Sequence, residues 1–169
     1  HKRDSVGKPL PGMQVRIDKP DADGVGEIHL TGPMVMTGYI DKEPIDSDLN
    51  TDDIGYVDED GFVYILNRRK DLIISGGENI YPKELEDLVY TLPSVKECAV
   101  VPVPDPKWGQ VPALFVAFHD GESMTADAIL SFMTKSLAKY KVPKYVKILP
   151  ALPRNGTGKI VRNELRLED

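Results

Sequence analysis

A lysine at the end of a glycine-rich run is the first feature of the sequence that could do chemistry. Residues 153–159 read Pro-Arg-Asn-Gly-Thr-Gly-Lys, and Lys159 closes the run. Glycines let backbone N–H groups turn toward an anion, and a lysine adds a mobile positive charge. The run is not a Walker A loop, because Pro153 and Ile160 stand where that motif needs Gly and Ser or Thr. Residues 153–159 therefore predict either an anion-binding tip or a solvated turn.

Three other places could bind a ligand. The pair Gly76-Gly77 lies between an expected strand and an expected helix, and it would allow close approach by a ligand or another chain, or simply form a tight turn. Trp108 lies in an expected loop, where it could stack on a ring or pack against the protein. Asp52 and Asp53 could bind a metal or a sugar diol, although we favour a turn capped by acids.

Composition excludes several classes of protein. The 169 residues carry a net charge of −6, which argues against general nucleic-acid binding. The single cysteine, Cys98, permits no intrachain disulfide, and the three histidines are too far apart in sequence to suggest a metal site. No apolar run approaches the roughly 20 residues of a transmembrane helix, and the N-terminus has no signal-peptide pattern. We expect a cytoplasmic protein that, lacking an initiator Met, begins inside a longer chain.

Charge is unevenly distributed along the sequence. Residues 41–60 contain nine acids and one lysine, whereas residues 135–166 contain nine bases and one acid, Glu164. Two solvated faces are one interpretation. The other is that the basic end faces a polyphosphate ligand.

The expected elements give an α+β protein. Alternation and glycine-bounded turns predict strands at 14–18 and 26–32 and a hairpin of 55–57 with 62–66, so residues 1–66 form a small all-β unit. A polar run at 67–71 indicates a linker. Residues 71–169 form a compact α/β sandwich; its elements are a strand at 72–75, a helix from Pro82, strands at 98–103 and 114–118, a helix from the cap Thr125 to about residue 139, a strand at 145–149 and a short helix at 163–167.

Five segments, taken in order, resemble the adenylate-forming superfamily of acyl-CoA synthetases, luciferases and peptide-synthetase adenylation domains. They cover almost the whole chain. The segments are 26–32 with Gly38-Tyr39, 50–55, 68–82, 104–112 and 153–159. Within the superfamily, residues 67–69, 107–112 and 137–143 look most like the 2-succinylbenzoate–CoA ligases of bacterial menaquinone synthesis.

The resemblance implies a two-step reaction by a longer enzyme. A carboxylic acid and Mg²⁺-ATP give an acyl-adenylate, and CoA then displaces AMP. The chain would hold the last β-subdomain of the large N-terminal domain (residues 1–66), a hinge linker (67–70) and the mobile C-terminal lid (71–169). We expect it to be inactive without the rest of that N-terminal domain. The alternatives are a fatty or aryl acid–CoA ligase, an adenylation domain that serves a carrier protein, and a non-enzymatic module that binds a partner through residues 135–166.

The resemblance also assigns roles to residues that stand at the family's motif positions. Lys159 matches the catalytic lysine, Asp53 the aspartate that binds the ribose hydroxyls, and Arg68 an arginine near the nucleotide sugar. Lys70 falls at the hinge. Asp52 departs from the pattern, because the family usually has Gly there.

A second group of positions is implied to serve CoA. Gly77, together with Gly76, matches the glycines that line the pantetheine tunnel, and Trp108 is a candidate CoA contact. No residue is assigned to a metal.

Overall fold

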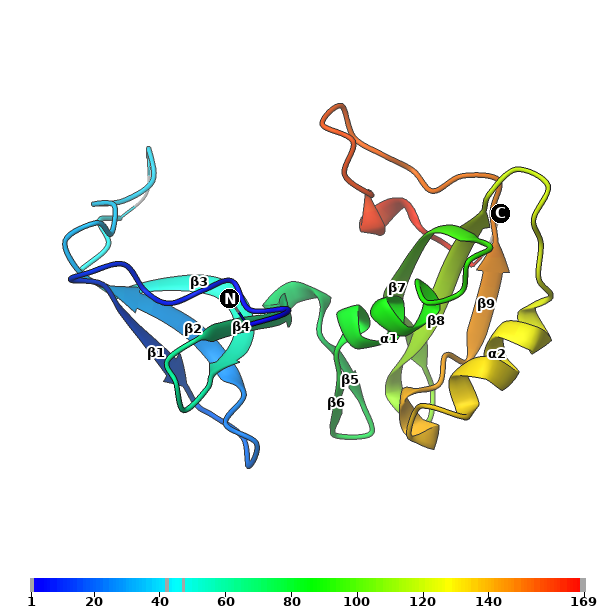
Figure 1. Cartoon of the computed structure of the whole chain (residues 1–169), viewed down its shortest axis with the longest axis horizontal. Helices are drawn as coiled ribbons and strands as arrows, with labels where there is room; N and C mark the ends of the chain where they lie inside the picture. Colours follow the sequence, from blue (N-terminus) through cyan, green and yellow to red (C-terminus); the bar gives the residue numbers. More distant parts are fainter. Residues whose placement is uncertain (1, 42, 47, 168–169) are drawn as a thin grey trace. The chain divides into compact units, whose positions relative to one another are not determined.

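The computed structural model describes residues 2–41, 43–46 and 48–167, and it has the mixed sheets and few helices of an α+β protein. The chain divides into two compact units, residues 1–70 and residues 71–169, which Figure 1 shows in blue to green and in green to red. Each unit has its own sheet, and the second also carries the two α-helices.

The first unit is a four-stranded antiparallel meander in the order β1-β2-β3-β4. Alternating apolar residues bury one face, with Ile28, Ile54 and Val63 in its core. The expected strands and hairpin are confirmed; the strands are β1 Gln14–Asp18, β2 Gly26–Thr31, β3 Asp48–Val57 and β4 Val63–Arg68.

The polar run that suggested a linker begins inside a strand. β4 continues through Arg68, so Asn67 pairs with Ile54 and Arg68 with Asp53. A 3-10 helix, Arg69–Asp71, follows. β4 is the last strand of its sheet, and residues 6–7 hydrogen-bond to Val63 on its outer edge.

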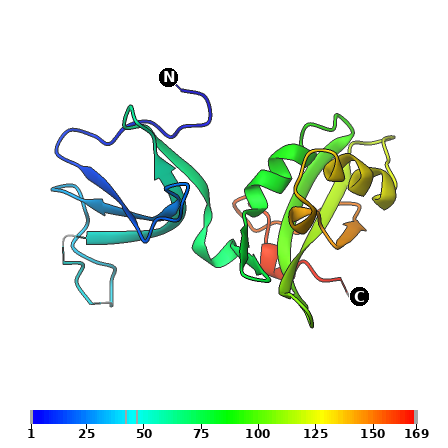
Figure 2. The same ribbon diagram turned by 90° about the horizontal axis from the view of Figure 1, so that it is seen from below.

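The second unit is a five-stranded sheet in the order β6-β5-β8-β7, with β9 parallel to β8. Two helices, α1 Pro82–Val89 and α2 Ala126–Thr134, lie on the same side of this sheet (Figures 1 and 2). The strands are β5 Ile73–Ser75, β6 Glu78–Ile80, β7 Val95–Asp105, β8 Gly109–Phe118 and β9 Tyr145–Ile148.

Alternation along β7 and β8 gives this sheet two buried faces. Val100 and Leu114 point into the core beneath the helices, together with Leu85 of α1 and Met133 of α2. The residues between them point the other way, into a second core that Leu152 and Leu165 of the C-terminal segment cover; its strand residues are Ala99, Val101, Ala113, Phe115 and Ala117. The C-terminal segment is thus a structural layer of the unit.

The helix starts were predicted better than the helix ends. Pro82 opens α1, and the Thr125 hydroxyl accepts a hydrogen bond from Ala128 N at the start of α2. α2 ends at Thr134, however, and not near residue 139. The chain must turn there to place β9 beside β8, so tertiary pairing overrides helical propensity.

Two short elements also differ from expectation. The helix predicted at 163–167 is a 3-10 helix, Arg162–Glu164. No helix follows Gly77 directly, because β6 comes first.

None of the helices in the described ranges has the length and apolar character that crossing a membrane requires.

Candidate functional site

The structure brings together the two residues expected at the nucleotide sugar. Asp53 and Arg68 are direct partners in the β3–β4 ladder, and Arg68 Nε lies 2.8 Å from Asp53 Oδ1. The Asp53 side chain is 15% exposed, whereas that of Arg68 is 57% exposed. Arg68 also donates to the carbonyl of Thr51 at 3.2 Å. This pairing fixes the direction of the Asp53 carboxylate and leaves part of the guanidinium open to a ligand.

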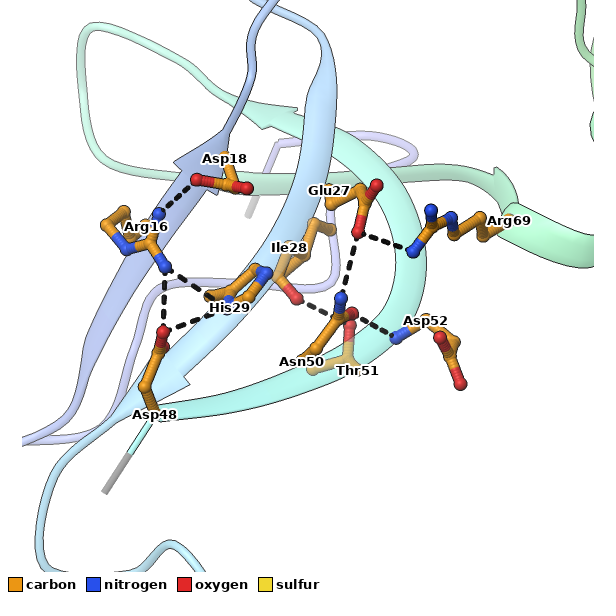
Figure 3. Close-up of polar contacts among 10 residues, drawn as sticks. All are labelled: Arg16, Asp18, Glu27, Ile28, His29, Asp48, Asn50, Thr51, Asp52 and Arg69. Atoms are coloured by element: carbon orange, nitrogen blue, oxygen red, sulfur yellow. Dashed lines mark hydrogen bonds and ion pairs between the residues drawn. The ribbon is translucent and has the colours of Figure 1, made fainter. Parts of the chain in front are cut away.

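The Asp52 position needs a special backbone conformation. Asp52 has φ of 59°, the left-handed region that glycine adopts freely and that Asp and Asn adopt more readily than other residues. Its N–H donates to Asn50 Oδ1 at 2.8 Å, and its carboxylate projects away from Asn50 and Thr51 (Figure 3). Asp52 therefore adopts the left-handed backbone conformation at a position where the family usually has Gly.

Neighbouring contacts hold this turn of β3 in place. Asn50 Nδ2 donates to Glu27 Oε2 at 2.8 Å, and Thr51 Oγ1 donates to the carbonyl of Ile28 at 2.9 Å (Figure 3). Arg69 Nη1 lies 3.1 Å from the same Glu27 oxygen, so the residue before Lys70 is tied to β2. Lys70 is exposed and lies in the 3-10 helix that ends the first unit.

Gly76 and Gly77 form the two-residue turn of the β5–β6 hairpin. Their φ values are 59° and 92°, and two consecutive positive values are the mark of a type I′ turn, which glycine favours strongly. β6 was not predicted, because its three residues, Glu78–Ile80, carry only one apolar side chain. The turn conformation alone therefore explains a Gly-Gly pair here.

The two glycines have different surroundings. Gly76 N donates to the carbonyl of Trp108 at 2.9 Å, and a Cβ added to Gly76 would lie 2.7 Å from Trp108 Cε3. A Cβ added to Gly77 would meet nothing within 4 Å. Gly76 is therefore constrained by packing against the indole, whereas Gly77 faces open space that a ligand could enter.

We predict that Gly76→Ala displaces the indole of Trp108, because the new methyl group would overlap the ring. Trp108 is the only tryptophan in the chain, so its emission reports on this contact directly. We expect a shift of the emission maximum in Gly76→Ala. The matched variant Gly77→Ala has a similar backbone cost and open space, and it should leave the emission unchanged; equal shifts in both would contradict the contact.

Asp105 organises the loop that presents Trp108. Its Oδ1 accepts hydrogen bonds from the N–H groups of Lys107 at 2.8 Å and Trp108 at 2.9 Å, and its Oδ2 lies 2.6 Å from Lys144 Nζ. The Asp105 side chain is 2% exposed. The Lys144 hydrogen bond, followed by the two backbone N–H bonds, lowers the pKa of Asp105 from 3.8 to about 2.

The depressed pKa of Asp105 predicts a pH dependence of stability. Because the folded state holds the ionised form, its contribution is complete above pH 3.8 and is lost as the pH falls toward about 2. Comparing the thermal unfolding midpoint of the wild type with that of Asp105→Asn from pH 7 to pH 2 checks this. The difference between the two proteins should shrink in the acid range, and a constant difference would contradict the assignment.

The run that carries Lys159 is a closed turn. We call residues 153–161 the Lys159 arm: Val161 N donates to the carbonyl of Pro153 at 2.8 Å, and Asn155 N to that of Lys159 at 3.0 Å. The side chain of Asn155 accepts from the N–H groups of Thr157 at 3.1 Å and Lys159 at 2.9 Å. These donors are already satisfied, so the prediction of an anion-binding backbone is wrong for them, and the arm offers the lysine side chain instead.

Four of the nine bases in segment 135–166 pair with carboxylates of the same unit. Lys141 pairs with Glu84, Lys144 with Asp105, and arginines 154 and 162 with Glu97 and Glu86. These four bases are neutralised by the protein itself, and the interpretation that the basic end faces a polyphosphate stays a prediction. Lys159 is exposed, and no carboxylate in the described part of the chain lies within ion-pair distance of its ammonium.

The Lys159 arm and the glycine hairpin occupy opposite ends of the second unit. In Figure 1 the orange segment that follows β9 forms a loop at one end, and the turn between β5 and β6 lies at the other. One unit thus presents two separate candidate functional surfaces. Among residues 2–41, 43–46 and 48–167, no group of three or more His, Cys, Asp or Glu side chains is arranged to hold a metal ion.

Comparison with known proteins agrees with these features. Residues 84–159 match the family described as AMP-binding enzyme C-terminal domain. The chain is 54% identical over 165 residues to 2-succinylbenzoate–CoA ligase of Lactococcus lactis, covering 98% of this chain and 36% of the relative. It is 49% identical over 175 residues to the enzyme of the same name from Bacillus cereus strain Q1, covering 96% and 35%.

A solved structure shows the same fold. The o-succinylbenzoate CoA synthetase of Bacillus subtilis, in complex with its acyl-adenylate intermediate, matches with a TM-score of 0.87 and 39% identity over 98% of this chain and 36% of that one. The chain spans about a third of the length of these relatives. We conclude that the chain contains the C-terminal domain of the AMP-binding enzymes and is similar, over almost its whole length, to 2-succinylbenzoate–CoA ligases.

Proposed function

We propose that the chain is the C-terminal part of an acid–CoA ligase that works in two steps. In the first, a carboxylate oxygen attacks the α-phosphorus of ATP, the bond to the β-phosphate oxygen breaks, and pyrophosphate leaves. In the second, the CoA thiolate attacks the acyl carbon and AMP leaves. The observation that carries the proposal is a lysine with no ion-pair partner among the described residues and an open glycine turn, which lie at opposite ends of one unit.

Lys159 serves the first step. The carboxylate and the α-phosphate are both anions, and a cation between them offsets their repulsion and the charge that develops in the transition state. Because the ammonium of Lys159 has no ion-pair partner among the described residues, it is available for this role without first breaking a contact. The closed arm limits the positions that the side chain can take.

Asp53 and Arg68 serve the nucleotide. The Asp53 carboxylate, held by Arg68 Nε at 2.8 Å, accepts hydrogen bonds from the ribose hydroxyls, and the exposed guanidinium lies beside the sugar. Mg²⁺ arrives with ATP as part of the substrate, and it would supply charge neutralisation at the phosphates. The described residues include no cluster of ligands for it.

Gly76 and Gly77 serve the second step. The open space at Gly77 admits the pantetheine arm of CoA, and Trp108, packed on Gly76, is exposed at the same turn for contact with CoA. Because the glycine turn and the Lys159 arm lie at opposite ends of the second unit, we propose that this unit rotates between the steps. Lys70, the last residue of the first unit, is the pivot.

The substrate we propose is 2-succinylbenzoate, and the support is the relatives that carry that name over almost the whole chain. The acid-binding pocket would lie in the N-terminal part of such an enzyme. A fatty or aryl acid is therefore the alternative substrate, and the thiol of a carrier protein is the alternative to that of CoA.

We also propose a cytoplasmic location, which agrees with the single, unpaired and buried thiol of Cys98.

Pyrophosphate exchange into ATP, measured with the full-length enzyme that contains this chain, tests the proposal. A panel of acids that includes 2-succinylbenzoate, a fatty acid and an aryl acid should show exchange with 2-succinylbenzoate above the others. CoA should then release AMP, and a carrier protein should not replace it. The isolated chain should show no exchange, and exchange by the isolated chain would contradict the assignment of roles between the domains.

A further inference from the structure

The Lys159 arm is anchored at its base by two arginines that reach back to the sheet. Before the turn, Arg154 Nη2 lies 3.3 Å from Glu97 Oε2 of β7. Directly after the arm, Arg162 meets Glu86 of α1 through two parallel contacts, Nη1 to Oε1 at 2.5 Å and Nη2 to Oε2 at 2.9 Å. The pairing of Arg162 with Glu86 was not predicted from the sequence, because the two residues are 76 positions apart.

The Arg162–Glu86 pair also closes the open edge of β7. Glu86 Oε1 accepts the N–H of Val100 at 2.7 Å, and Arg162 Nη1 donates to the carbonyl of Val100 at 2.9 Å. β7 is the last strand of the sheet, so its outward N–H and C=O groups have no strand partner there. The pair therefore joins three elements: α1, the edge of β7 and the segment that leads out of the arm.

The geometry of this contact demands arginine. The planar guanidinium matches a carboxylate in a two-pronged contact, whereas a lysine ammonium is a point charge that cannot reproduce it. The Glu86 side chain is only 10% exposed, so loss of its partner would leave a carboxylate largely buried and uncompensated. The two-pronged geometry therefore fixes the orientation of the Arg162 side chain, and breaking the ion pair would be energetically costly.

Anchoring at Arg162 has a direct consequence for Lys159. The two residues are three positions apart, and the arm between Pro153 and Val161 is closed by hydrogen bonds, so its tip follows any tilt of its base. Arg162 Nε also lies 3.9 Å from Asp71, the first residue of the second unit. The base of the arm is therefore held to both α1 and the start of the unit.

We propose that Arg162 and Glu86 are positioning residues that fix the Lys159 ammonium for adenylate formation. The inference rests on the proposed function, because it specifies how that function's lysine is held. Neither side chain contacts the reacting atoms; they act through the arm. A displacement of about 1 Å at a reacting group can cost roughly 100-fold in rate, so a loosened base is enough to produce a large effect.

Arg162→Lys in the full-length enzyme is the test, because it keeps the charge and removes the two-pronged contact. We expect adenylate formation to slow by roughly 10- to 100-fold. Thioester formation from pre-made acyl-adenylate should stay within about twofold, because the arm has no part in that step. Arg166→Lys is the matched control, since the guanidinium of Arg166 donates to the carbonyl of Leu165 at 2.9 Å, whereas Arg162 is the arginine that pairs with Glu86.

A double variant separates positioning from general stability. If Arg162 acts through Lys159, then Arg162→Lys should slow adenylate formation no further once Lys159 is Ala. Glu86→Gln keeps an acceptor for the Val100 N–H and should also slow adenylate formation. It serves as the test if Arg162→Lys folds poorly. Equal loss in both steps, or the same fold-loss in the Lys159→Ala background, would overturn the proposal.

Hydrogen exchange supplies a readout that does not depend on activity. The amides of Thr157, Gly158 and Lys159 are bonded within the arm, and that of Leu165 donates to the carbonyl of Arg162 at 3.2 Å. In Arg162→Lys we expect faster exchange at Leu165 than in the wild type, and unchanged exchange there would overturn the anchoring. A wild-type enzyme that forms no adenylate would instead refute the proposed function, and the exchange result would still decide the anchoring.

Discussion

Replacing Lys159 with alanine should slow adenylate formation by roughly 100- to 1000-fold, the range found when one preorganised electrostatic contact to a transition state is removed. The ammonium has no ion-pair partner among the described residues, whereas Arg154, the other cation of the arm, is tied to Glu97. Rapid quench with the full-length enzyme, ATP and the acid measures this step. Transfer of a pre-made acyl group from its adenylate to CoA should keep its normal rate.

Lys135→Ala is the matched control for Lys159→Ala. It removes the same charge from an exposed lysine just after α2. Both rate constants should stay within about twofold of the wild type, because surface charges far from the reacting atoms are screened by solvent. If Lys135→Ala were as slow as Lys159→Ala, loss of net positive charge would explain the result, and the specific role of Lys159 would be wrong.

The Gly77→Leu variant should show the reverse pattern, with thioester formation slowed by roughly 100-fold and adenylate formation nearly unchanged. An added Cβ at Gly77 would meet nothing in the protein within 4 Å, so a leucine would fill the space proposed for pantetheine rather than disturb the core. Single-turnover transfer from pre-made acyl-adenylate to CoA measures the affected step.

Backbone strain at Gly77 needs its own control, because φ is 92° there and a leucine in that region costs about 1–2 kcal/mol. Gly121 offers a close match: its φ is 82°, and a Cβ added there would also meet nothing within 4 Å. Gly121→Leu should lower stability by a similar amount and leave both steps unchanged. Slow thioester formation in Gly121→Leu would show that strain, and not obstruction, accounts for the Gly77 result.

Local patterns were sufficient to predict most elements of the fold. The alternation at 14–18 and 26–32 marks β1 and β2, Pro82 marks the start of α1, and Thr125 caps α2. These signals are read from neighbouring residues, so a single sequence contains them. The end of α2 was predicted too late because the turn after Thr134 is set by the pairing of β9 with β8, which no local pattern records.

For the candidate site, the sequence indicates individual residues but not the long-range contacts that hold them. Residue types at motif positions point to Asp53, Arg68, Gly77 and Lys159, but the contacts that hold these residues come from distant parts of the chain. Asp105 and Lys144 are 39 positions apart, and Glu86 and Arg162 are 76 apart. Asn155 is the exception, because its side chain accepts hydrogen bonds from the nearby N–H groups of Thr157 and Lys159.

Measuring both half-reactions in the same preparations of wild type, Lys159→Ala and Gly77→Leu tests the central claim most directly, namely that one unit serves the two steps with two different ends. The account predicts opposite losses: Lys159→Ala slows adenylate formation alone, and Gly77→Leu slows thioester formation alone. If both variants slowed the same step, or each slowed both steps equally, the two ends would not have separate roles and the account would be wrong.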